Sequence, residues 1–293
     1  MKYTQKGDSI MLEEAHDFNI GQILECGQCF RFEKLDDGFY EIVAMGKVLL
    51  ARQKGDCVAF SYHHSELGTD EFKAIWMPYF DLQRDYGAIK AMFADCDIMA
   101  QAMAFAPGIR ILNQDPWETV VSFIISQNNR IPQIKQVIRN ICARYGKQIE
   151  GSNHFSFPSP EQLAEANLED LRICKTGFRD KYILGAARAA TSGDLILIRE
   201  SSLTTAELRA NLMAIHGIGE KVAHCCLLFG YSRFDAFPVD VWVRRAMQSL
   251  YFQGQPTPAA EILAFANEKF GEHSGFAQQY LFHYARLNGI GTK

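Results

Sequence analysis

The sequence predicts an α+β protein in which an antiparallel β-sheet domain with some helices, residues 1–108, precedes an all-α helical body, residues 109–293. Three observations predict this class. Between residues 21 and 62, apolar and polar side chains alternate and glycine-containing turns interrupt them, which is typical of antiparallel hairpins. From residue 115 onward, capping residues and apolar positions three or four apart favour helices. The composition, 48% hydrophobic and 22% charged, is that of an ordinary globular protein.

The alternation in the first domain predicts four strands. They cover residues 30–32, 40–44, 48–52 and 58–62, with turns at 36–38, 45–46 and 54–56. Residues 71–104 change to a helical spacing of their apolar positions, Ile89, Met92, Phe93 and Met99. No apolar run is long enough to span a membrane, and the first eleven residues lack the features of an export signal. We therefore expect a cytoplasmic protein with reduced cysteines.

Three stretches of the second domain begin with helix-capping residues: 115–118, 159–162 and 204–207. Each places Asp, Ser or Thr first and Glu or Gln three positions later, which is the sequence of a capped helix start. The first two also have proline at the first helical position, where its missing N–H is not needed. Each stretch therefore predicts the beginning of a helix.

A helix-hairpin-helix pattern occupies about residues 206–229, with His216-Gly217-Ile218-Gly219 at its turn. Two glycines allow a sharp turn and a close approach to another surface. The unpaired N–H groups at the start of the following helix can hold a phosphate without a basic side chain. As a bare pattern, the motif is equally typical of an ordinary helical hairpin.

The net charge of −4 is unevenly distributed along the chain. Residues 1–108 carry 10 Lys and Arg against 17 Asp and Glu, a net charge of −7, whereas residues 109–293 carry 20 against 17, a net charge of +3. For a nucleic-acid partner such as DNA, the second domain is therefore the expected binding side. Charge permits DNA binding here and does not establish it.

Lys221 and Asp240 are the residues best suited to chemistry. Lys221 lies at the start of the second hairpin helix, and Asp240 lies near the end of the loop of residues 235–241, where it can cap another helix. Taken alone, the lysine is typical of a solvated side chain and the aspartate of a structural cap. Together they supply an amine nucleophile and an anion that can stabilise positive charge.

This hairpin, with the lysine and the proline-containing loop that ends in aspartate, resembles the helix-hairpin-helix (HhH-GPD) DNA glycosylase superfamily. The resemblance implies that Lys221 attacks the anomeric carbon of the sugar and that Asp240 stabilises the charge developing there. Four further segments resemble those of the 8-oxoguanine DNA glycosylases: residues 27–32, 122–129, 176–179 and 277–282. Within that family, the chain most resembles the clostridial-type bacterial subgroup. The resemblance runs from about Gly27 to Arg286 and implies a TBP-like N-terminal sheet.

Four residues are implied to bind the damaged base. The carbonyl of Gly27 would accept a hydrogen bond from the N7–H that only the oxidised base carries, and Gln278 would bind the base edge. Phe282 would stack on the base, one helical turn after Gln278. Cys225, one turn after Lys221, would lie against the base. Without the resemblance, Cys225 and Phe282 are typical of ordinary core packing.

The remaining implied contacts are to DNA around the flipped nucleotide. Asn128, followed by Asn129, would fill the gap, Phe178 would wedge beside the orphaned base, and Arg179 would contact that base. Gly217 and Gly219 would approach phosphates. The chain departs from the family at two places: Trp242 replaces a phosphate-binding histidine, and Gln133 replaces a second arginine on the orphaned base. We therefore expect a relaxed preference for cytosine opposite the lesion.

The expected activity is that of a bifunctional DNA glycosylase and AP lyase that excises 8-oxoguanine through a lysine Schiff base and then nicks the strand by β-elimination. The expected partner is double-stranded DNA containing oxidised guanine, bound by a monomer in the bacterial cytoplasm. Cys26 and Cys29 form a single C-x-x-C pair, which is too little to predict a zinc site. The run of four cysteines that holds an iron–sulfur cluster in related glycosylases is absent from the sequence, so we expect no cofactor. Whether the hairpin turn binds a structural monovalent cation is left open by the sequence.

Two other functions remain possible from the sequence. An alkylpurine glycosylase of the same superfamily shares the sheet domain and the aspartate but does not require Lys221. A non-catalytic DNA-binding protein would use the hairpin only to clamp phosphates. It explains Gly217 and Gly219 but not Lys221 and Asp240 occurring with them.

Overall fold

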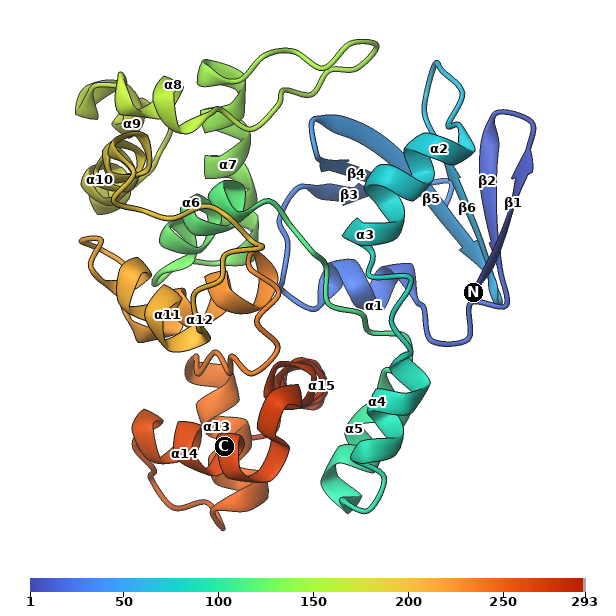
Figure 1. The fold of residues 1–293 in the computed structure, drawn as a ribbon, viewed down its shortest axis with the longest axis vertical. Helices are drawn as coiled ribbons and strands as arrows, with labels where there is room; N and C mark the ends of the chain where they lie inside the picture. The colour runs from blue at the N-terminus through green and yellow to red at the C-terminus, as the bar shows by residue number, and fades with distance from the viewer. Residues whose placement is uncertain (292–293) are drawn as a thin grey trace.

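The structure, a computed structural model, describes residues 1–291. Figure 1 shows a β-sheet domain beside a larger helical body. The six strands form one antiparallel sheet in the order β1-β2-β6-β5-β4-β3. Their bounds are β1 Lys2–Lys6, β2 Ser9–Glu13, β3 Phe32–Lys34, β4 Tyr40–Ala44, β5 Lys47–Lys54 and β6 Cys57–Ser61. The predicted α+β class is confirmed.

Strands β3 to β6 lie close to the four predicted strands, but the beginning of the chain differs from the prediction. Strands β1 and β2 were not predicted. In β1 only Tyr3 is even partly buried, so the strand shows no apolar alternation. In β2 the buried Ile10 and Leu12 do alternate with their neighbours, a signal that sequence reasoning missed. The helix α1, Ile20–Glu25, stands where we expected the meander to begin. Its Asn19 cap accepts a hydrogen bond from the Gln22 N–H at 3.0 Å, and six residues are too few to show a helical period.

The sheet and α1 share a core with the first of the predicted helices. These helices are α2 Thr69–Glu71, the π-helical turn η1 Phe72–Trp76 and α3 Met77–Tyr79. Phe72 and Trp76 are fully buried and pack with Phe60 of β6 and Phe80 in one aromatic cluster. Helical structure within residues 71–104 is thus confirmed.

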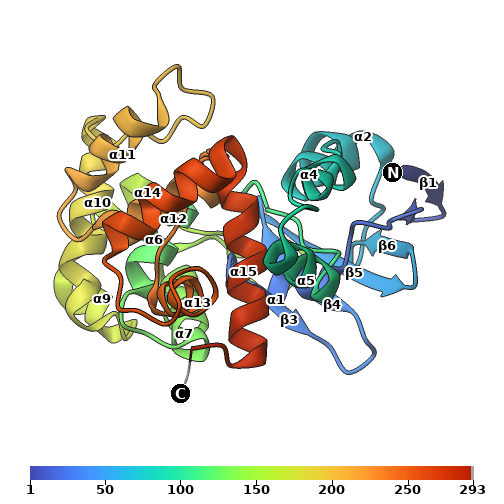
Figure 2. The same cartoon turned by 90° about the horizontal axis from the view of Figure 1, so that it is seen from below.

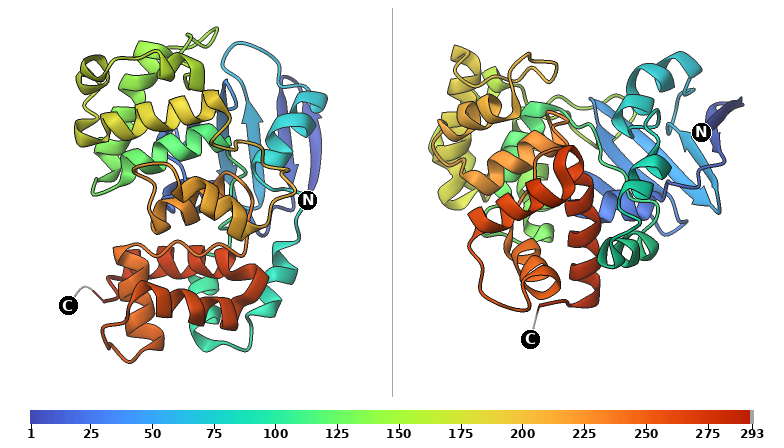
Figure 3. Two further views of the ribbon diagram at one scale, coloured as in Figure 1. Left: turned by 60° about the vertical axis from the view of Figure 1, so that its left-hand side comes forward. Right: turned by 60° about the horizontal axis from the view of Figure 1, so that its bottom comes forward.

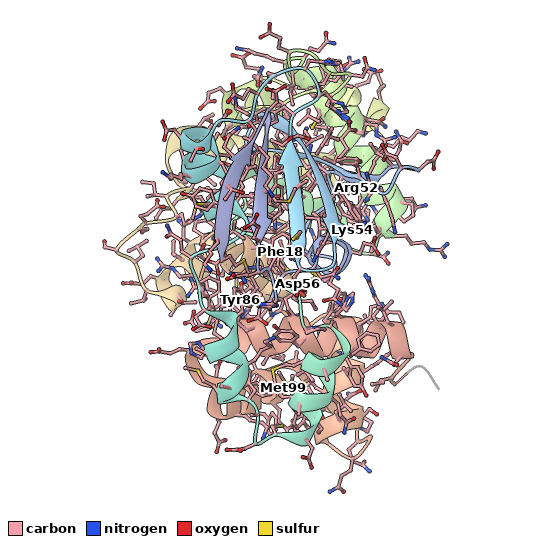
Figure 4. All side chains as sticks on the ribbon, turned by 90° about the vertical axis from the view of Figure 1, so that its right-hand side faces the viewer. Phe18, Arg52, Lys54, Asp56, Tyr86 and Met99 are labelled. Atoms are coloured by element: carbon pink, nitrogen blue, oxygen red, sulfur yellow. The ribbon has the colours of Figure 1, made fainter. Side chains whose placement is uncertain are left out.

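The next two helices, α4 Tyr86–Met92 and α5 Asp97–Phe105, pack elsewhere. Ile89 and Met99 belong to the core of the helical body, and the ring of Tyr86 lies edge-on to Phe276 of that body at 5.5 Å. Figure 4 shows Tyr86 and Met99 below the sheet. The proposed boundary at residues 108 and 109 stays a prediction, although these helices share the core of the second domain.

The helical body begins where the capping residues predict. Asp115 accepts a hydrogen bond from the Glu118 N–H at 2.8 Å, and Ser159 and Thr204 form complete capping boxes. The bounds are α6 Pro116–Ser126, α7 Ile131–Tyr145, α8 Pro160–Ala164, α9 Leu168–Ile173, η2 Gly177–Arg179, α10 Asp180–Ser192, α11 Thr205–Met213, α12 Glu220–Phe229, α13 Val241–Tyr251, α14 Ala259–Phe270, η3 Gly271–His273 and α15 Ser274–Asn288. Within residues 1–291, no helix has the length and apolar character needed to cross a membrane.

Two helices of this body position the candidate site. The hairpin pair α11 and α12 lies between the α6–α10 layer and the α13–α15 layer, as Figure 3 shows. Helix α15 lies beside α1 of the sheet domain in Figure 2. There Arg286 donates a hydrogen bond to the carbonyl of Glu25 at 2.5 Å. This contact holds the turn after α1 against the C-terminal part of α15.

Candidate active site

One cavity contains all the predicted catalytic and base-binding residues. It is lined by Gly27, Lys221, Cys225, Asp240, Gln278 and Phe282. These residues come from the turn after α1, from α12, from the start of α13 and from α15. Residues separated by up to 255 positions in the chain therefore meet at one site, as the resemblance implied.

The hairpin that carries Lys221 is held by close packing at Gly217. This glycine has φ +94°, and a Cβ there would lie 2.3 Å from Cγ of Tyr182. Gly219 caps α12 in an extended conformation with open space around it. The turn therefore needs glycine at 217 for both backbone and steric reasons, whereas nothing in the fold needs it at 219.

Lys221 stands half-buried in the first turn of α12. Its Nζ donates a hydrogen bond to Oγ of Ser126 at 3.3 Å and lies 5.1 Å from the ring centroid of Phe123. Burial raises the pKa of the Cys225 thiol to about 11, against the opposing effect of Lys221. The thiol therefore stays protonated and uncharged beside the amine at neutral pH.

Asp240 is the N-cap of α13. Its Oδ1 accepts a hydrogen bond from the Val243 N–H at 2.7 Å, which anchors the carboxylate at the positive end of the helix. The charge of Asp240 also acts on the Cys225 thiol, with a sign opposite to that of Lys221. Both charged groups therefore lie near the same sulfur atom and face one cavity.

Gly27 and Phe282 form the opposite wall of this cavity. A Cβ at Gly27 would lie 3.1 Å from the Phe282 ring, and the φ of Gly27 is +82°. The fully buried Gln28 holds this turn, because its Nε2 donates to the carbonyls of Ile23 and Arg110, each at 2.8 Å. The position of the Gly27 backbone is thus determined by a neighbour that the sequence did not single out.

Gln278 has unused hydrogen-bonding capacity at the cavity. Its side chain is buried, its Nε2 donates to the Pro238 carbonyl at 3.4 Å, and its Oε1 has no hydrogen-bond partner among residues 1–291. Gln279, which also lines the cavity, has a buried Oε1 without a partner as well. Buried polar atoms are normally satisfied, so these two amides suit a polar ligand. Sequence reasoning missed Gln279 and Ser126, although both lie within the quoted motifs.

The predicted DNA contacts surround the hairpin. Asn128 is exposed in a left-handed conformation, φ +48°, directly after Gln127, which follows α6. Phe178 projects from η2 with 56% of its surface exposed. Nε2 of Gln127 donates a hydrogen bond to the Gly217 carbonyl at 3.0 Å, so the loop of Asn128 is tied to the hairpin.

Arg179 holds the loop that carries Asn128. It is buried, and its guanidinium donates to the carbonyls of Gln127, Asn128 and Thr176. Contact with an orphaned base stays a prediction, because in this structure the side chain holds the Asn128 loop instead.

The other predicted contacts at the DNA-facing side are simpler. Asn129 donates to the carbonyl of Ile125 at 3.2 Å and so closes the end of α6. Trp242 is half-buried in the first turn of α13, with the Arg245 guanidinium 5.9 Å from its ring. Gln133 is exposed in the first turn of α7.

Two family models match the chain. Residues 10–120 match the model of the 8-oxoguanine DNA glycosylase N-terminal domain. Residues 121–271 match that of the HhH-GPD superfamily base excision DNA repair proteins. Together the two matches extend over both the sheet domain and most of the helical body.

Individual proteins agree with these matches. A probable N-glycosylase/DNA lyase of Methanothermobacter thermautotrophicus is 31% identical over 72% of this chain and 74% of its own length. The N-glycosylase/DNA lyase of Saccharomyces cerevisiae is 32% identical over 79% of this chain and 68% of its own. The 8-oxoguanine glycosylase/lyase of Clostridium acetobutylicum, solved with double-stranded DNA containing cytosine opposite 8-oxoguanine, is 40% identical, covers 99% of both chains and has a TM-score of 0.93.

Proposed function

This chain belongs to the HhH-GPD superfamily of base-excision DNA repair proteins, and we propose that it excises 8-oxoguanine from double-stranded DNA as a bifunctional glycosylase and AP lyase. The observation that carries the proposal is the single cavity shared by Lys221, Asp240 and the implied base-binding residues. An amine and a carboxylate at one cavity are the groups that nucleophilic displacement at a sugar needs.

The reaction begins with the base held in the cavity outside the duplex. Neutral Lys221 attacks C1′ of the deoxyribose through Nζ, the bond from C1′ to the base breaks, and its electron pair leaves with the base. The carboxylate of Asp240 stabilises the positive charge that the sugar develops meanwhile. The side chain of Ser126, 3.3 Å from Nζ, holds the amine toward the cavity.

The lyase step follows from the same bond. The amine passes a proton to the ring oxygen O4′ as the C1′–O4′ bond breaks, and the lone pair of Nζ forms a protonated Schiff base with C1′. This cation makes the C2′ proton acidic. The excised base takes this proton, and the electron pair of the C2′–H bond forms a C2′=C3′ double bond. The 3′ phosphate leaves with the electron pair of the C3′–O bond, which nicks the strand. Every group used belongs to the protein or the DNA, and we propose that a monomer performs both steps without a cofactor.

Recognition of the oxidised base is assigned to the other wall of the cavity. The Gly27 carbonyl accepts the N7–H of the lesion, Phe282 and Cys225 enclose its faces, and Gln278 binds its edge. The rigid hold of Gln28 on this turn and the unpartnered Oε1 of Gln278 support these roles. A protonated, uncharged Cys225 suits contact with an aromatic base.

Lys221→Gln tests the nucleophile. The variant keeps a polar side chain of similar length, so we expect duplex binding to remain near the wild-type level. Borohydride should trap wild-type protein on DNA containing 8-oxoguanine and should not trap the variant, because no Schiff base forms. A duplex of the same sequence with undamaged guanine is the matched control. Trapping of the variant at wild-type levels would rule out Lys221 as the nucleophile.

Substrate release separates the proposal from its alternatives. The similarity to the 3-methyladenine DNA glycosylase of Archaeoglobus fulgidus, at 20% identity and a TM-score of 0.76, concerns the fold alone. We expect 8-oxoguanine to be released much faster than 3-methyladenine from matched duplexes. Preferential release of methyladenine would favour the alkylpurine alternative, and no release from any lesion would favour a non-catalytic DNA-binding protein.

A further inference from the structure

A second hollow lies outside the active-site cavity, between η2 and the hairpin turn. We call it the wedge hollow; Phe178, Tyr182 and His216 form its aromatic walls, and four charged side chains form the rest. Its lining residues come mainly from the end of α9, the start of α10 and the segment between them, and these two helices lie at the left-hand edge of the helical body in Figure 1. The ring of Tyr182 contacts both other aromatic rings, at 6.1 Å and 5.0 Å between centroids.

The four charged residues leave a surplus of positive charge. Arg172 donates to the buried carboxylate of Asp180 at 2.6 Å, so these two charges offset each other. Lys175 and Lys181 are both exposed, and neither ammonium has a carboxylate within 4.0 Å among residues 1–291. Two free cations therefore border a hollow in a chain whose net charge is −4.

Both lysines stand where they are locally unfavourable. Lys175 has φ +65° in the position after the C-cap of α9, where glycine is the unstrained residue. Lys181 lies in the first turn of α10, where the helix dipole disfavours a cation, although the Asp180 carboxylate accepts a hydrogen bond from the Lys181 N–H at 2.7 Å. Neither side chain is buried, so packing does not compensate either placement. Local rules broken without a packing gain are typical of functional positions.

We propose that Lys175 and Lys181 bind backbone phosphates of the DNA strand opposite the lesion, on either side of the nucleotide that has lost its partner. The inference rests on the proposed function, which places Phe178 beside the orphaned base. Lys175 precedes Phe178 by three residues and Lys181 follows it by three. A phosphate beside each lysine would pair an ammonium that has no carboxylate within 4.0 Å among residues 1–291.

This contact gives a weakly charged protein a second anchor on DNA. The N–H groups of the hairpin hold one strand, and the two lysines hold the other while the wedge separates the bases. Each neutralised phosphate contributes roughly 0.9 to the slope of log affinity against log salt concentration. Loss of each lysine should therefore lower the magnitude of that slope by about 0.9, and loss of both by about 1.8.

The test measures duplex affinity over a range of salt concentrations in the full-length protein. The variants are Lys175→Ala, Lys181→Ala and their combination, all in the Lys221→Gln background so that the DNA stays intact. Lys54→Ala is the matched control, because Lys54 is an exposed lysine on the sheet domain, as Figure 4 shows. We expect the slope to fall for the first three and to stay unchanged for the control.

Neutral methylphosphonate linkages identify the strand. They are placed one at a time in the strand opposite the lesion. For each lysine, we expect one linkage at which its substitution no longer lowers the salt slope. If such linkages occur only in the lesion strand, or if the slopes do not change, the proposal is wrong. If the wild-type chain cleaves 8-oxoguanine DNA and the lysine variants keep the full slope, this inference alone is refuted. If the wild-type chain cleaves no lesion, the proposed function is refuted.

Lys175→Gly provides an independent check against a folding defect. Glycine relieves the left-handed backbone strain, so the variant should melt at a higher temperature than wild type while its salt slope falls as in Lys175→Ala. A variant that gains thermal stability and keeps the full slope contradicts the phosphate contact.

Discussion

Gly217→Ala should disrupt the hairpin turn more than any other small substitution in it. The glycine has φ +94°, and an alanine Cβ would lie 2.3, 2.6 and 2.7 Å from three carbon atoms of Tyr182. Holding a non-glycine residue in a sparsely populated backbone region costs about 1–3 kcal/mol. Overpacking against a neighbouring side chain adds about 1–3 kcal/mol. We therefore expect the free energy of unfolding to fall by at least about 2 kcal/mol.

The effect should extend to DNA binding. Tyr182 contacts both Phe178 and His216, and the Gly217 carbonyl accepts the hydrogen bond from Gln127. Displacing the Tyr182 ring therefore moves the wedge and the hairpin together. Urea unfolding gives the stability change, and titration of a duplex containing 8-oxoguanine gives the affinity, which should also fall.

Gly219→Ala is the matched control for stability. Gly219 has φ −93°, and a Cβ there meets no atom within 4 Å. The free energy of unfolding should stay within ~0.5 kcal/mol of wild type. DNA affinity should still fall, because the methyl group enters the space that a phosphate would approach. The steric and backbone reasoning is refuted if Gly217→Ala unfolds at the same urea concentration as wild type.

Two further perturbations test contacts at different places, one at the hairpin and one between the sheet domain and the loop that contains His154. Gln127→Leu removes the hydrogen bond to Gly217 and should lower stability by about 1 kcal/mol, with a larger loss in single-turnover excision than in duplex affinity. At Glu41, burial raises the pKa, but hydrogen bonds from His63 and His154 outweigh it and hold the pKa below its ordinary value. Its stabilisation is therefore complete at neutral pH and lost as the pH falls below about 4.3. Urea unfolding at pH 7 and pH 3.5 should show a smaller loss for Glu41→Gln than for wild type; an equal loss would contradict the assignment.

Local features of this chain could be predicted because their causes lie within a few residues. Asp115, Ser159 and Thr204 cap helices through their own neighbours, and the alternation of β6 reports one buried face. In β5 the sheet core takes Leu49 and Ala51, but the strand also buries a residue on its other face, so its alternation is less informative. Where the local signal was weak, the prediction was incomplete. Strand β1 is almost wholly exposed, and α1 has only six residues, so neither shows its period.

The sequence by itself determined the residue types of the site and the hairpin that presents Lys221. Only the tertiary structure decided that α15 brings Phe282 against Gly27 and that Lys221 contacts Ser126. It also decided that Arg179 is buried against backbone carbonyls. Caps and turns depend on bonds between near neighbours, whereas the shape of a cavity depends on how whole helices pack, and no short stretch of sequence contains that information.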